Sequence, residues 1–372
     1  MTKHLHIVSF DVPFPANYGG VIDVFYKIKA LHKLGIKIHL HTYEYGRGKS
    51  KELEKFCHKI IYYKRTKSLK NLISRKPFIV KTRNSAVLIS NLKKDDYPIL
   101  FEGLHTTFPV IKNGFSNKPI MVRTHNIEHK YYDGLAKSEK EFFKKRFYQS
   151  EAKKLKYYEK VLKKVDKILT ISPFEQAYFK NKFNGKATYI PVFHKNETVL
   201  DLSEKGDFAL YHGDLRVSDN EKAALFLIKV FKNLPYKLVI ASSYKNNCVN
   251  SKINTSDNIN FELLCPENEN QLTNLFKNAH INVLPTFQKT GIKLKLIHAL
   301  FASRFCIVND AMVEDTGIEP LCEIANTQKE FREKITTCFS KKYTKQEIEN
   351  RKKALIGFNT LENAKKIETL LT

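Results

Sequence analysis

Two loops in the first half of the sequence carry residue types that could bind a ligand. The first loop, residues 13–20, ends in Gly19 and Gly20. Glycines at a helix start let a ligand approach backbone N–H groups, and these groups together with the helix dipole favour a phosphate. A tight turn that needs a positive φ is the alternative use. No G-x-G-x-x-G fingerprint occurs, which argues against a dinucleotide-binding dehydrogenase.

The second loop, residues 123–129, has the sequence Arg-Thr-His-Asn-Ile-Glu-His. His125, Asn126 and Glu128 follow an apolar stretch directly, as polar residues do where a strand ends in a ligand-binding loop. The alternative is that His125 caps a turn. The spacing of the histidines and the glutamate matches neither a structural zinc pattern nor H-E-x-x-H, so we predict no metal site.

Two further loops lie in the second half of the sequence. Residues 212–216 combine a glycine turn with Arg216, and an arginine suits a bidentate contact with phosphate. Residues 285–300 run from an apolar stretch through a Thr-Gly loop into a predicted helix. Backbone N–H groups at the start of that helix and two nearby ammonium groups predict a cradle for a diphosphate. The residues of this cradle are Gly291, Ile292, Lys293 and Lys295.

The elements that position these loops alternate between strand-like and helix-like patterns. Residues 4–10, 21–34 and 36–43 predict a strand, a helix and a second strand, which is a βαβ unit of a parallel sheet. The first half continues with predicted strands at 97–101, 120–124 and 167–171 and a long helix at 137–164. The second half repeats the alternation, with strands at 208–211, 237–241, 259–264, 280–284 and 305–308 and helices at 221–232, 268–277 and 293–301.

This alternation predicts an α/β protein with two Rossmann-like domains. We place the domains at residues 1–195 and 206–345, and expect residues 346–372 to be helical and to pack back across the boundary. Ligands of parallel sheets bind at the carboxyl ends of the strands. We therefore expect the four loops to face one another across a cleft.

On these motifs the chain resembles glycosyltransferase family 4, a retaining family with the GT-B fold that includes many envelope polysaccharide enzymes. The likeness rests on the Gly19-Gly20 loop, the Thr-His-Asn-x-Glu-His segment, the Gly213 turn with Asn220, and residues 290–300. In that family the last segment normally reads G-x-K-x-K-x-x-E-A. The glutamate of that motif binds the nucleotide ribose, and an earlier acidic residue contacts the donor sugar.

This chain departs from the family pattern at both acidic positions. His298 stands where the ribose-binding glutamate is expected, and neither Thr290 nor Gln288 is acidic. A neutral imidazole can still bond a ribose hydroxyl, and a glutamine can bond a sugar hydroxyl.

The resemblance implies transfer of a sugar from a nucleotide-diphosphate donor to a glycan acceptor, including a lipid-linked one, with retention and without a metal or cofactor. It implies that His125 touches the donor sugar or the reacting centre. It places Gly19, Gly20, Asn126 and Glu128 at the acceptor and phosphate. The donor-binding residues it implies are Arg216, Gln288, Thr290, Gly291, Ile292, Lys293, Lys295 and His298.

The formal net charge of +26 favours anionic partners. The lysines are dispersed and no zinc-finger or RNP pattern occurs, so we predict no nucleic-acid partner. No apolar run reaches the roughly 18 residues that a membrane span needs, and the N-terminus lacks the features of a signal peptide. We predict a cytoplasmic protein, soluble or at the inner face of the membrane. The basic, aromatic stretch 137–167 fits either a lipid surface or the protein's own core.

Other classes of function remain open at this point. A sugar-nucleotide-binding protein without activity is compatible with the lost acidic positions. A nucleotide-sugar epimerase or a phosphorylase shares the fold, but the epimerase would carry acidic residues absent from 290–298, and the phosphorylase would need a pyridoxal-phosphate lysine. A nucleic-acid-binding protein is supported by charge alone.

Overall fold

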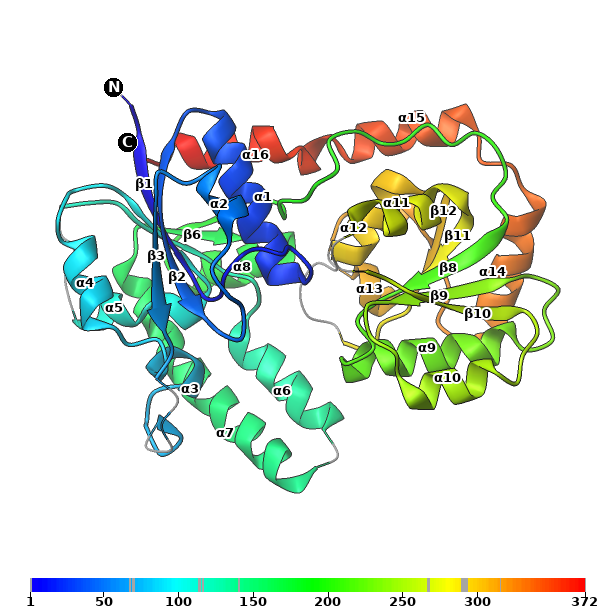
Figure 1. Ribbon diagram of the computed structural model, residues 1–372, viewed down its shortest axis with the longest axis horizontal. Coiled ribbons are helices and arrows are strands. Elements are labelled where there is room, and N and C mark those ends of the chain that lie inside the picture. Colours follow the sequence, from blue (N-terminus) through cyan, green and yellow to red (C-terminus); the bar gives the residue numbers. More distant parts are fainter. Residues whose placement is uncertain are drawn as a thin grey trace. The chain divides into compact units, whose positions relative to one another are not determined.

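The chain forms two compact units (Figure 1). The computed structural model describes residues 2–66, 68, 71–112, 115, 117–139, 141–265, 268–288, 294–314 and 316–371. The first unit comprises Met1–Lys195 and Phe358–Thr372, and the second comprises Asn196–Gly357. Residues 346–372, expected as one terminal segment, are divided between the two units.

The first unit is built on a parallel sheet with the strand order β3-β2-β1-β4-β5-β6-β7. The order reverses between β1 and β4, and such a switch point is where open α/β sheets bind ligands. The strands are β1 His4–Ser9, β2 Lys37–Glu44, β3 Lys59–Lys64, β4 Ile99–Glu102, β5 Ile120–Arg123, β6 Lys167–Thr170 and β7 Ala187–Tyr189.

Helices cover both faces of this sheet (Figure 1). Leu5 and Ile7 of β1 belong to one hydrophobic cluster and Val8 to another, because successive side chains of a strand point to opposite faces. The helices are α1 Gly19–Lys33, α2 Lys51–Glu54, α3 Phe78–Lys81, α4 Ala86–Leu92, α5 Phe108–Lys112, α6 Glu128–Ser138, α7 Phe142–Tyr158, α8 Pro173–Lys182 and α16 Thr360–Glu368.

Helix α1 shows how the local sequence sets an element. Val21, Val24 and Ile28 recur at helical spacing and are fully buried in the cluster that also holds Leu5. The helix ends before Gly35, which takes φ +81, a conformation that glycine adopts without steric cost. Helix α16 packs on α1 and returns the end of the chain to the first unit.

The long helix predicted over residues 137–164 is wrong. Helix α6 ends at Ser138, α7 runs over Phe142–Tyr158, and a 3₁₀ turn follows at Glu159–Lys164. The backbone at Glu139 and Glu141 is extended, and this polar stretch has no apolar side chain to bury between the two helices. Helices α6 and α7 therefore lie side by side as a hairpin (Figure 1).

The second unit has its own parallel sheet, with the order β10-β9-β8-β11-β12-β13 and a switch point between β8 and β11. The strands are β8 Phe208–His212, β9 Leu238–Ser242, β10 Ile259–Leu263, β11 Ala279–Val283, β12 Phe305–Val308 and β13 Glu323–Ile324. The helices are α9 Ser218–Phe231, α10 Asn247–Ile253, α11 Glu269–Asn278, α12 Leu294–Ala302, α13 Asp310–Val313, α14 Gln328–Ser340 and α15 Lys345–Ala354.

The terminal segment predicted to be helical, residues 346–372, is also interrupted. Helix α15 ends at Ala354, and α16 starts after Asn359, whose side chain accepts the first-turn N–H of Glu362. Within the part of the chain that the structure describes, no helix combines the length and the apolar character that crossing a membrane requires.

Candidate functional site

The four loops singled out in the sequence follow β1, β5, β8 and β11, so each lies at the carboxyl edge of its own sheet. In both units these strands lie at or beside the switch point. The loops therefore occupy the positions at which parallel α/β sheets bind ligands.

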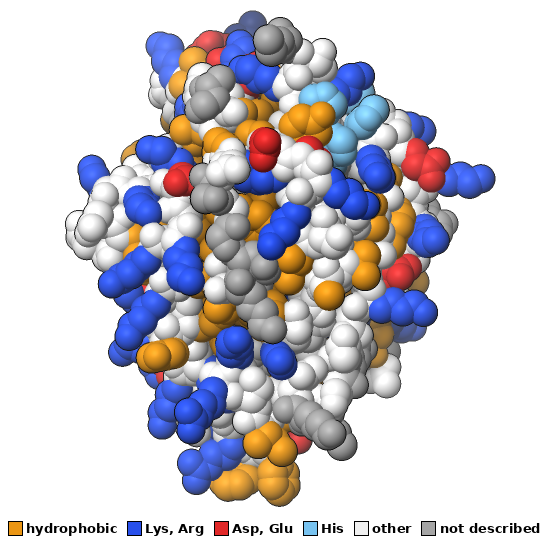
Figure 2. Space-filling view, turned by 90° about the vertical axis from the view of Figure 1, so that its left-hand side faces the viewer, with side chains coloured by type: hydrophobic (Ala, Val, Ile, Leu, Met, Phe, Trp, Pro, Cys, Tyr) orange, Lys and Arg blue, Asp and Glu red, His pale blue; other side chains and the backbone are white. Residues whose placement is uncertain are grey.

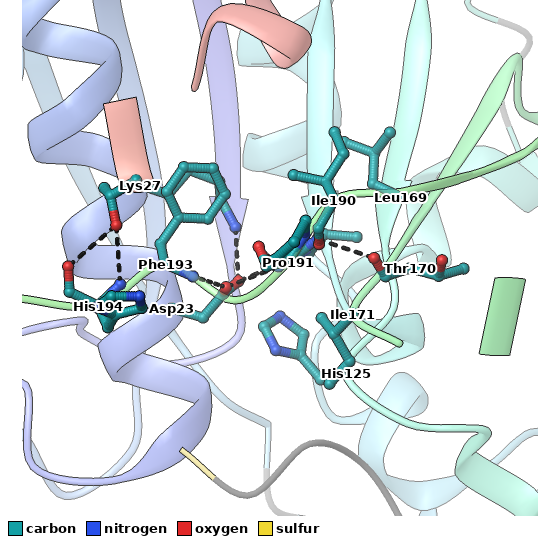
Figure 3. Close-up of polar contacts among 12 residues, drawn as sticks. Asp23, Lys27, His125, Leu169, Thr170, Ile171, Ile190, Pro191, Phe193 and His194 are labelled. Atoms are coloured by element: carbon teal, nitrogen blue, oxygen red, sulfur yellow. Dashed lines mark hydrogen bonds and ion pairs between the residues drawn. The ribbon is translucent and has the colours of Figure 1, made fainter. Parts of the chain in front are cut away.

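A buried network of charges supports the loop after β5. Asp23 of α1 accepts hydrogen bonds from the Arg123 guanidinium at 2.8 and 3.1 Å and from Lys27 Nζ at 2.9 Å. Lys27 also forms an ion pair with Glu102 at the end of β4, at 2.8 Å. His125 Nε2 lies 3.0 Å from Glu102 Oε2. We call these five residues the closed network; Figure 3 shows Asp23, Lys27 and His125.

The closed network is balanced within itself. Asp23, Lys27, Glu102 and Arg123 are at most 1% exposed. Burial alone would raise the pKa of Asp23, but the charges of Arg123 and Lys27 hold that pKa well below its usual range. Two buried cations thus neutralise two buried carboxylates.

The closed network also holds the segment after β7 in place. Arg123 donates to the carbonyls of Ile190 and Pro191, and the Phe193 N–H donates to Asp23 Oδ1 at 2.9 Å (Figure 3). The segment that follows β7 is therefore held against α1 and β5.

Asp23, Glu102 and His125 are the described residues that most resemble a metal site, since each offers a ligand atom within 4.8 Å of the others. Lys27 Nζ, however, is 2.9 Å from the first carboxylate and 2.8 Å from the second. The ammonium group already supplies the positive charge that a cation would bring. The arrangement is that of a salt-bridge network which orients His125.

His125 is held on one side and open on the other. Its ring lies edge-on to Phe10, with ring centroids 5.5 Å apart, and its side chain keeps 11% exposure. The Nε2 atom is fixed by Glu102, whereas Nδ1 has no hydrogen bond within the described residues. The sequence-predicted residue is therefore oriented with one ring nitrogen available.

Gly19 and Gly20 begin helix α1, and no side chain caps its first turn. Neither glycine is among the described residues with positive φ, so the tight-turn alternative is wrong. A Cβ on Gly20 would lie 2.7 Å from Phe10 Cζ, so the glycine lets the Phe10 ring pack against the helix start.

The rest of the second loop differs from the prediction in one residue. Asn126 is half-buried in the turn before α6. Glu128 is 2% exposed, and its Oε1 has no hydrogen-bond partner within the described residues. Burial, with the nearby charge of Glu175, raises the pKa of Glu128 to about 8. This burial places Glu128 inside the unit, in contrast to the predicted contact with acceptor or phosphate.

In the second unit, Lys295 reaches the end of β8. Its Nζ donates to Asn220 Oδ1 at 3.1 Å and lies 5.3 Å from the Tyr211 ring centroid. Asn220 in turn donates to the Asp214 carbonyl at 3.0 Å. A Cβ on Gly213 would lie 3.0 Å from Asn220 Cγ, so this turn is tightly packed. Lys295 Nζ thus lies at the carboxyl end of β8, and its role as a phosphate ligand stays a prediction.

Asp219, in the first turn of α9, holds the loop after β11 next to the end of β8. Its carboxylate accepts from Thr286 Oγ1 at 2.6 Å and from the Phe287 N–H at 2.9 Å. Gln288, which follows, is half-buried. The other predicted ligands of this loop, Thr290, Gly291, Ile292 and Lys293, lie outside the described residues.

Two residues that were predicted to bind the donor have other surroundings than expected. Arg216 is exposed and forms a bidentate pair with Asp214, with Nη2 2.7 Å from Oδ2. Its guanidinium is thus shared with a carboxylate two residues away. His298 lies half-buried on α12, within a helix whose other side chains are mostly buried.

Sequence analysis missed Asp23, Lys27, Glu102 and Asp219. A signal existed for the first two, because opposite charges four residues apart within an apolar helix suggest a buried pair. Glu102 and Asp219 find their partners only through the packing of distant elements.

No protein-family model matches the sequence. A curated Klebsiella pneumoniae protein, described as an uncharacterized 44.6 kDa protein in the cps region, is 26% identical over 330 residues. The match covers 84% of each chain.

Solved structures match over the whole chain. TarM superposes with a TM-score of 0.71 at 12% identity, covering 100% of this chain and 99% of its own. A glycosyltransferase from Rickettsia africae gives 0.68 at 15%, covering 100% and 98%. A S. aureus TarM mutant in complex with fondaparinux, alpha-GlcNAc-glycerol and UDP gives 0.67 at 13%, covering both chains fully.

The chain has the GT-B fold. In this GT-B chain, the first unit is the N-terminal Rossmann-like domain with the closed network. The second unit is the C-terminal domain with Lys295 and the Asp219-bound loop.

Proposed function

We propose that the protein is a glycosyltransferase that moves a sugar from a nucleotide-diphosphate donor to a glycan acceptor in cell-surface polysaccharide synthesis. The observation that carries the proposal is the GT-B fold over the full chain with Lys295 held at the carboxyl end of β8. The relative from a cps region and the TarM mutant crystallised with UDP support the same assignment.

The second unit would hold the donor. Lys295, Lys293 and Arg216 supply positive charge, and the N–H groups of Gly291 and Ile292 supply donors to the diphosphate. During transfer, negative charge grows on the leaving nucleoside diphosphate. Fixed cations and backbone dipoles stabilise that charge without needing to reorganise. In this proposal the residues of the chain fill the electrostatic role that a metal ion plays in other transferases.

The first unit would bring His125 to the reacting sugar. Because Glu102 fixes Nε2, the ring presents Nδ1, which can bond a sugar hydroxyl. We propose that transfer retains the anomeric configuration, as the likeness to family 4 implies.

We further propose that the first unit contacts an anionic membrane through the start of α7, on the cytoplasmic side. Phe142 and Phe143 are 63% and 78% exposed beside Lys144, Lys145 and Arg146, whereas Leu155 and Tyr158 near the end of the helix are buried. Figure 2 shows hydrophobic and basic side chains together at its lower end.

Sedimentation with anionic vesicles should fall for Phe142→Ser and stay unchanged for Tyr157→Ser, a change at an exposed aromatic near the other end of α7. Equal sedimentation of both variants would refute this contact.

A panel of nucleotide sugars tests the function itself. We expect one class of nucleotide sugar to raise the melting temperature and to be hydrolysed or transferred. His125→Ala should lower turnover far more than donor affinity, because the ring acts at the sugar and the nucleotide binds elsewhere. If no nucleotide sugar binds, or if His125→Ala turns over at the wild-type rate, the corresponding assignment is wrong.

A sugar-nucleotide-binding protein without activity is the second candidate. Gln288, Thr290 and His298 favour it, because the acidic residues expected from family 4 are missing at these positions. Tight donor binding with neither hydrolysis nor transfer to any glycan would support it over the first.

A further inference from the structure

Two arginines at the carboxyl edge of the first unit lack an acidic partner. Arg65 follows β3, and Arg83 follows α3. Neither forms an ion pair with any Asp or Glu among the described residues. We call Arg65 and Arg83 the arginine pair.

Arg83 is almost completely buried. It is 4% exposed, and it donates from Nε to the Phe10 carbonyl at 3.0 Å and from Nη1 to the Ile79 carbonyl at 2.7 Å. Its Nη2 forms no hydrogen bond within the described residues. Burial, followed by the charge of Arg65, lowers the pKa of Arg83 to about 10, so the group stays charged at neutral pH.

Arg65 extends beside it and is half-buried. Its Nη2 and Nε donate to Thr82 Oγ1 at 2.9 and 3.3 Å, and Thr82 directly precedes Arg83. The guanidinium stacks on Tyr45, 4.1 Å from the ring centroid. Both guanidinium groups are therefore held in fixed orientations by neutral partners.

The acidic groups nearby balance these two charges only in part, because the charge of Asp11 acts on both arginines without an ion pair to either. Asp11 accepts from Tyr18 OH at 3.0 Å and from the Val12 N–H at 2.9 Å, and its nearest cation is Arg47 at 3.7 Å. Glu128 is buried with a pKa raised to about 8, so it is largely uncharged at neutral pH. Two partly desolvated positive charges without an ion-pair partner among the described residues are costly, unless a bound anion compensates them.

The arginine pair lies close to the proposed reacting centre. Phe10, whose carbonyl accepts from Arg83, packs its ring against both His105 and His125, with centroids 5.4 and 5.5 Å away. Burial holds the pKa of His105 well below its usual value, and the charges of Arg83, His125 and Arg65 lower that pKa further. The arginine pair and His125 therefore lie at the same edge of the sheet, and Phe10 contacts both Arg83 and His125.

We propose that Arg65 and Arg83 bind an oxyanion of the acceptor, a carboxylate or a phosphate on the glycan. The planar fork of each guanidinium matches the geometry of both groups. The identification of the ligand as the acceptor rests on the proposed function. The anion site itself stands on the geometry of the arginine pair.

The test uses the full-length protein saturated with UDP, so that the nucleotide site is filled. Glucuronate and inorganic phosphate are the probes, and neutral glucose is the control. We expect one of the anions to bind the wild type and to bind Arg65→Gln at least about tenfold more weakly, since a charged hydrogen-bond partner is lost. Arg146→Gln, which removes an exposed arginine of α7, should bind as the wild type does.

Arg83→Lys supplies a second variant that keeps the charge and loses the fork. It should also weaken anion binding, while its UDP affinity stays at the wild-type value. A preference for glucuronate would indicate an acidic sugar in the acceptor, and a preference for phosphate would indicate a phosphorylated one. Equal anion affinity in the wild type, Arg65→Gln and Arg83→Lys, or no anion binding at all, would overturn the proposal. If neither UDP nor any other nucleoside diphosphate binds the wild type, the glycosyltransferase assignment is contradicted instead.

Discussion

The closed network and the arginine pair are two groups of buried or half-buried cations in the same unit, and they differ in compensation. In the closed network, Lys27 and Arg123 face Asp23 and Glu102 at hydrogen-bonding distance. In the arginine pair, Arg65 and Arg83 face carbonyl oxygens, a hydroxyl group and an aromatic ring. Compensated charges hold elements together, whereas uncompensated charges at a sheet edge indicate that part of the structure is supplied by a ligand.

This difference assigns separate roles within one loop cluster. The closed network fixes α1, β4 and the segment after β7, and it orients His125 as a consequence. Arg83 also ties β1 to α3 through two carbonyls, but its Nη2 forms no hydrogen bond within the described residues, so the arginine pair keeps a donor for a ligand. Mutations should therefore separate the two: stability responds to the first, and anion binding responds to the second.

The largest expected effect comes from breaking the closed network. Asp23→Asn leaves Arg123 and Lys27 buried without their shared carboxylate, and removal of one partner of a buried pair costs about 3–5 kcal/mol. Urea unfolding should show a loss of this size. Asp133→Asn is the control, because the Asp133–Lys137 pair is exposed and should cost less than about 1 kcal/mol. If Asp23→Asn is as stable as the wild type, the closed network does not differ from the arginine pair in its contribution to stability.

A third group of the same unit sharpens the comparison, because burial disfavours the charged form of its histidines, although His6 Nε2 lies 2.9 Å from Asp95 Oδ1. His6 Nδ1 lies 2.9 Å from His41 Nε2, and His41 Nδ1 lies 2.8 Å from Tyr63 OH. Burial lowers the pKa of His6, and burial together with the His6 charge lowers the pKa of His41 to about 3. Figure 2 shows that further histidines gather on this face.

These buried histidines predict acid instability. The unfolded chain protonates His41 near pH 6.5, whereas the folded chain resists protonation down to about pH 3, so stability falls as pH decreases through this window. His41 alone should cost about 2 kcal/mol at pH 5 relative to pH 7. Urea unfolding at both pH values measures this, and His41→Gln should reduce the difference. A wild-type stability that is the same at pH 5 and pH 7 would contradict the prediction.

The smallest effect on stability is expected for the arginine pair. Arg65→Gln removes one of two like charges that have no acidic partner, so stability without ligand should change by less than about 1 kcal/mol. The same variant should lose the stabilisation that the bound anion gives the wild type. A destabilisation as large as that of Asp23→Asn would show that Arg65 is a structural residue.

The sequence predicts the elements well where hydrophobic periodicity is strong. Helix α1 and strands β1, β2 and β12 lie within two residues of their predicted bounds, because alternating and helical patterns of Val, Ile and Leu define them locally. The breaks after Ser138 and Ala354 were missed, since polar helical stretches carry little periodic signal.

The candidate site was predictable in position and less so in composition. A polar loop after an apolar strand is visible in the sequence, so His125 and Lys295 were found at sheet edges. The roles of Glu102, Arg65 and Arg83 depend on contacts with residues distant in the sequence, such as Lys27 and Phe10. The burial of Glu128 could not be predicted, because the sequence does not show which side of its helix faces the core.

Calorimetric titration of nucleoside diphosphates tests the central claim most directly. We predict that the wild type binds a nucleoside diphosphate, that Lys295→Ala binds it at least about tenfold more weakly, and that Lys229→Ala, at the far end of α9, binds it as the wild type does. If no nucleoside diphosphate binds, or if Lys295→Ala retains the wild-type affinity, the second unit is not the donor-binding domain that we propose.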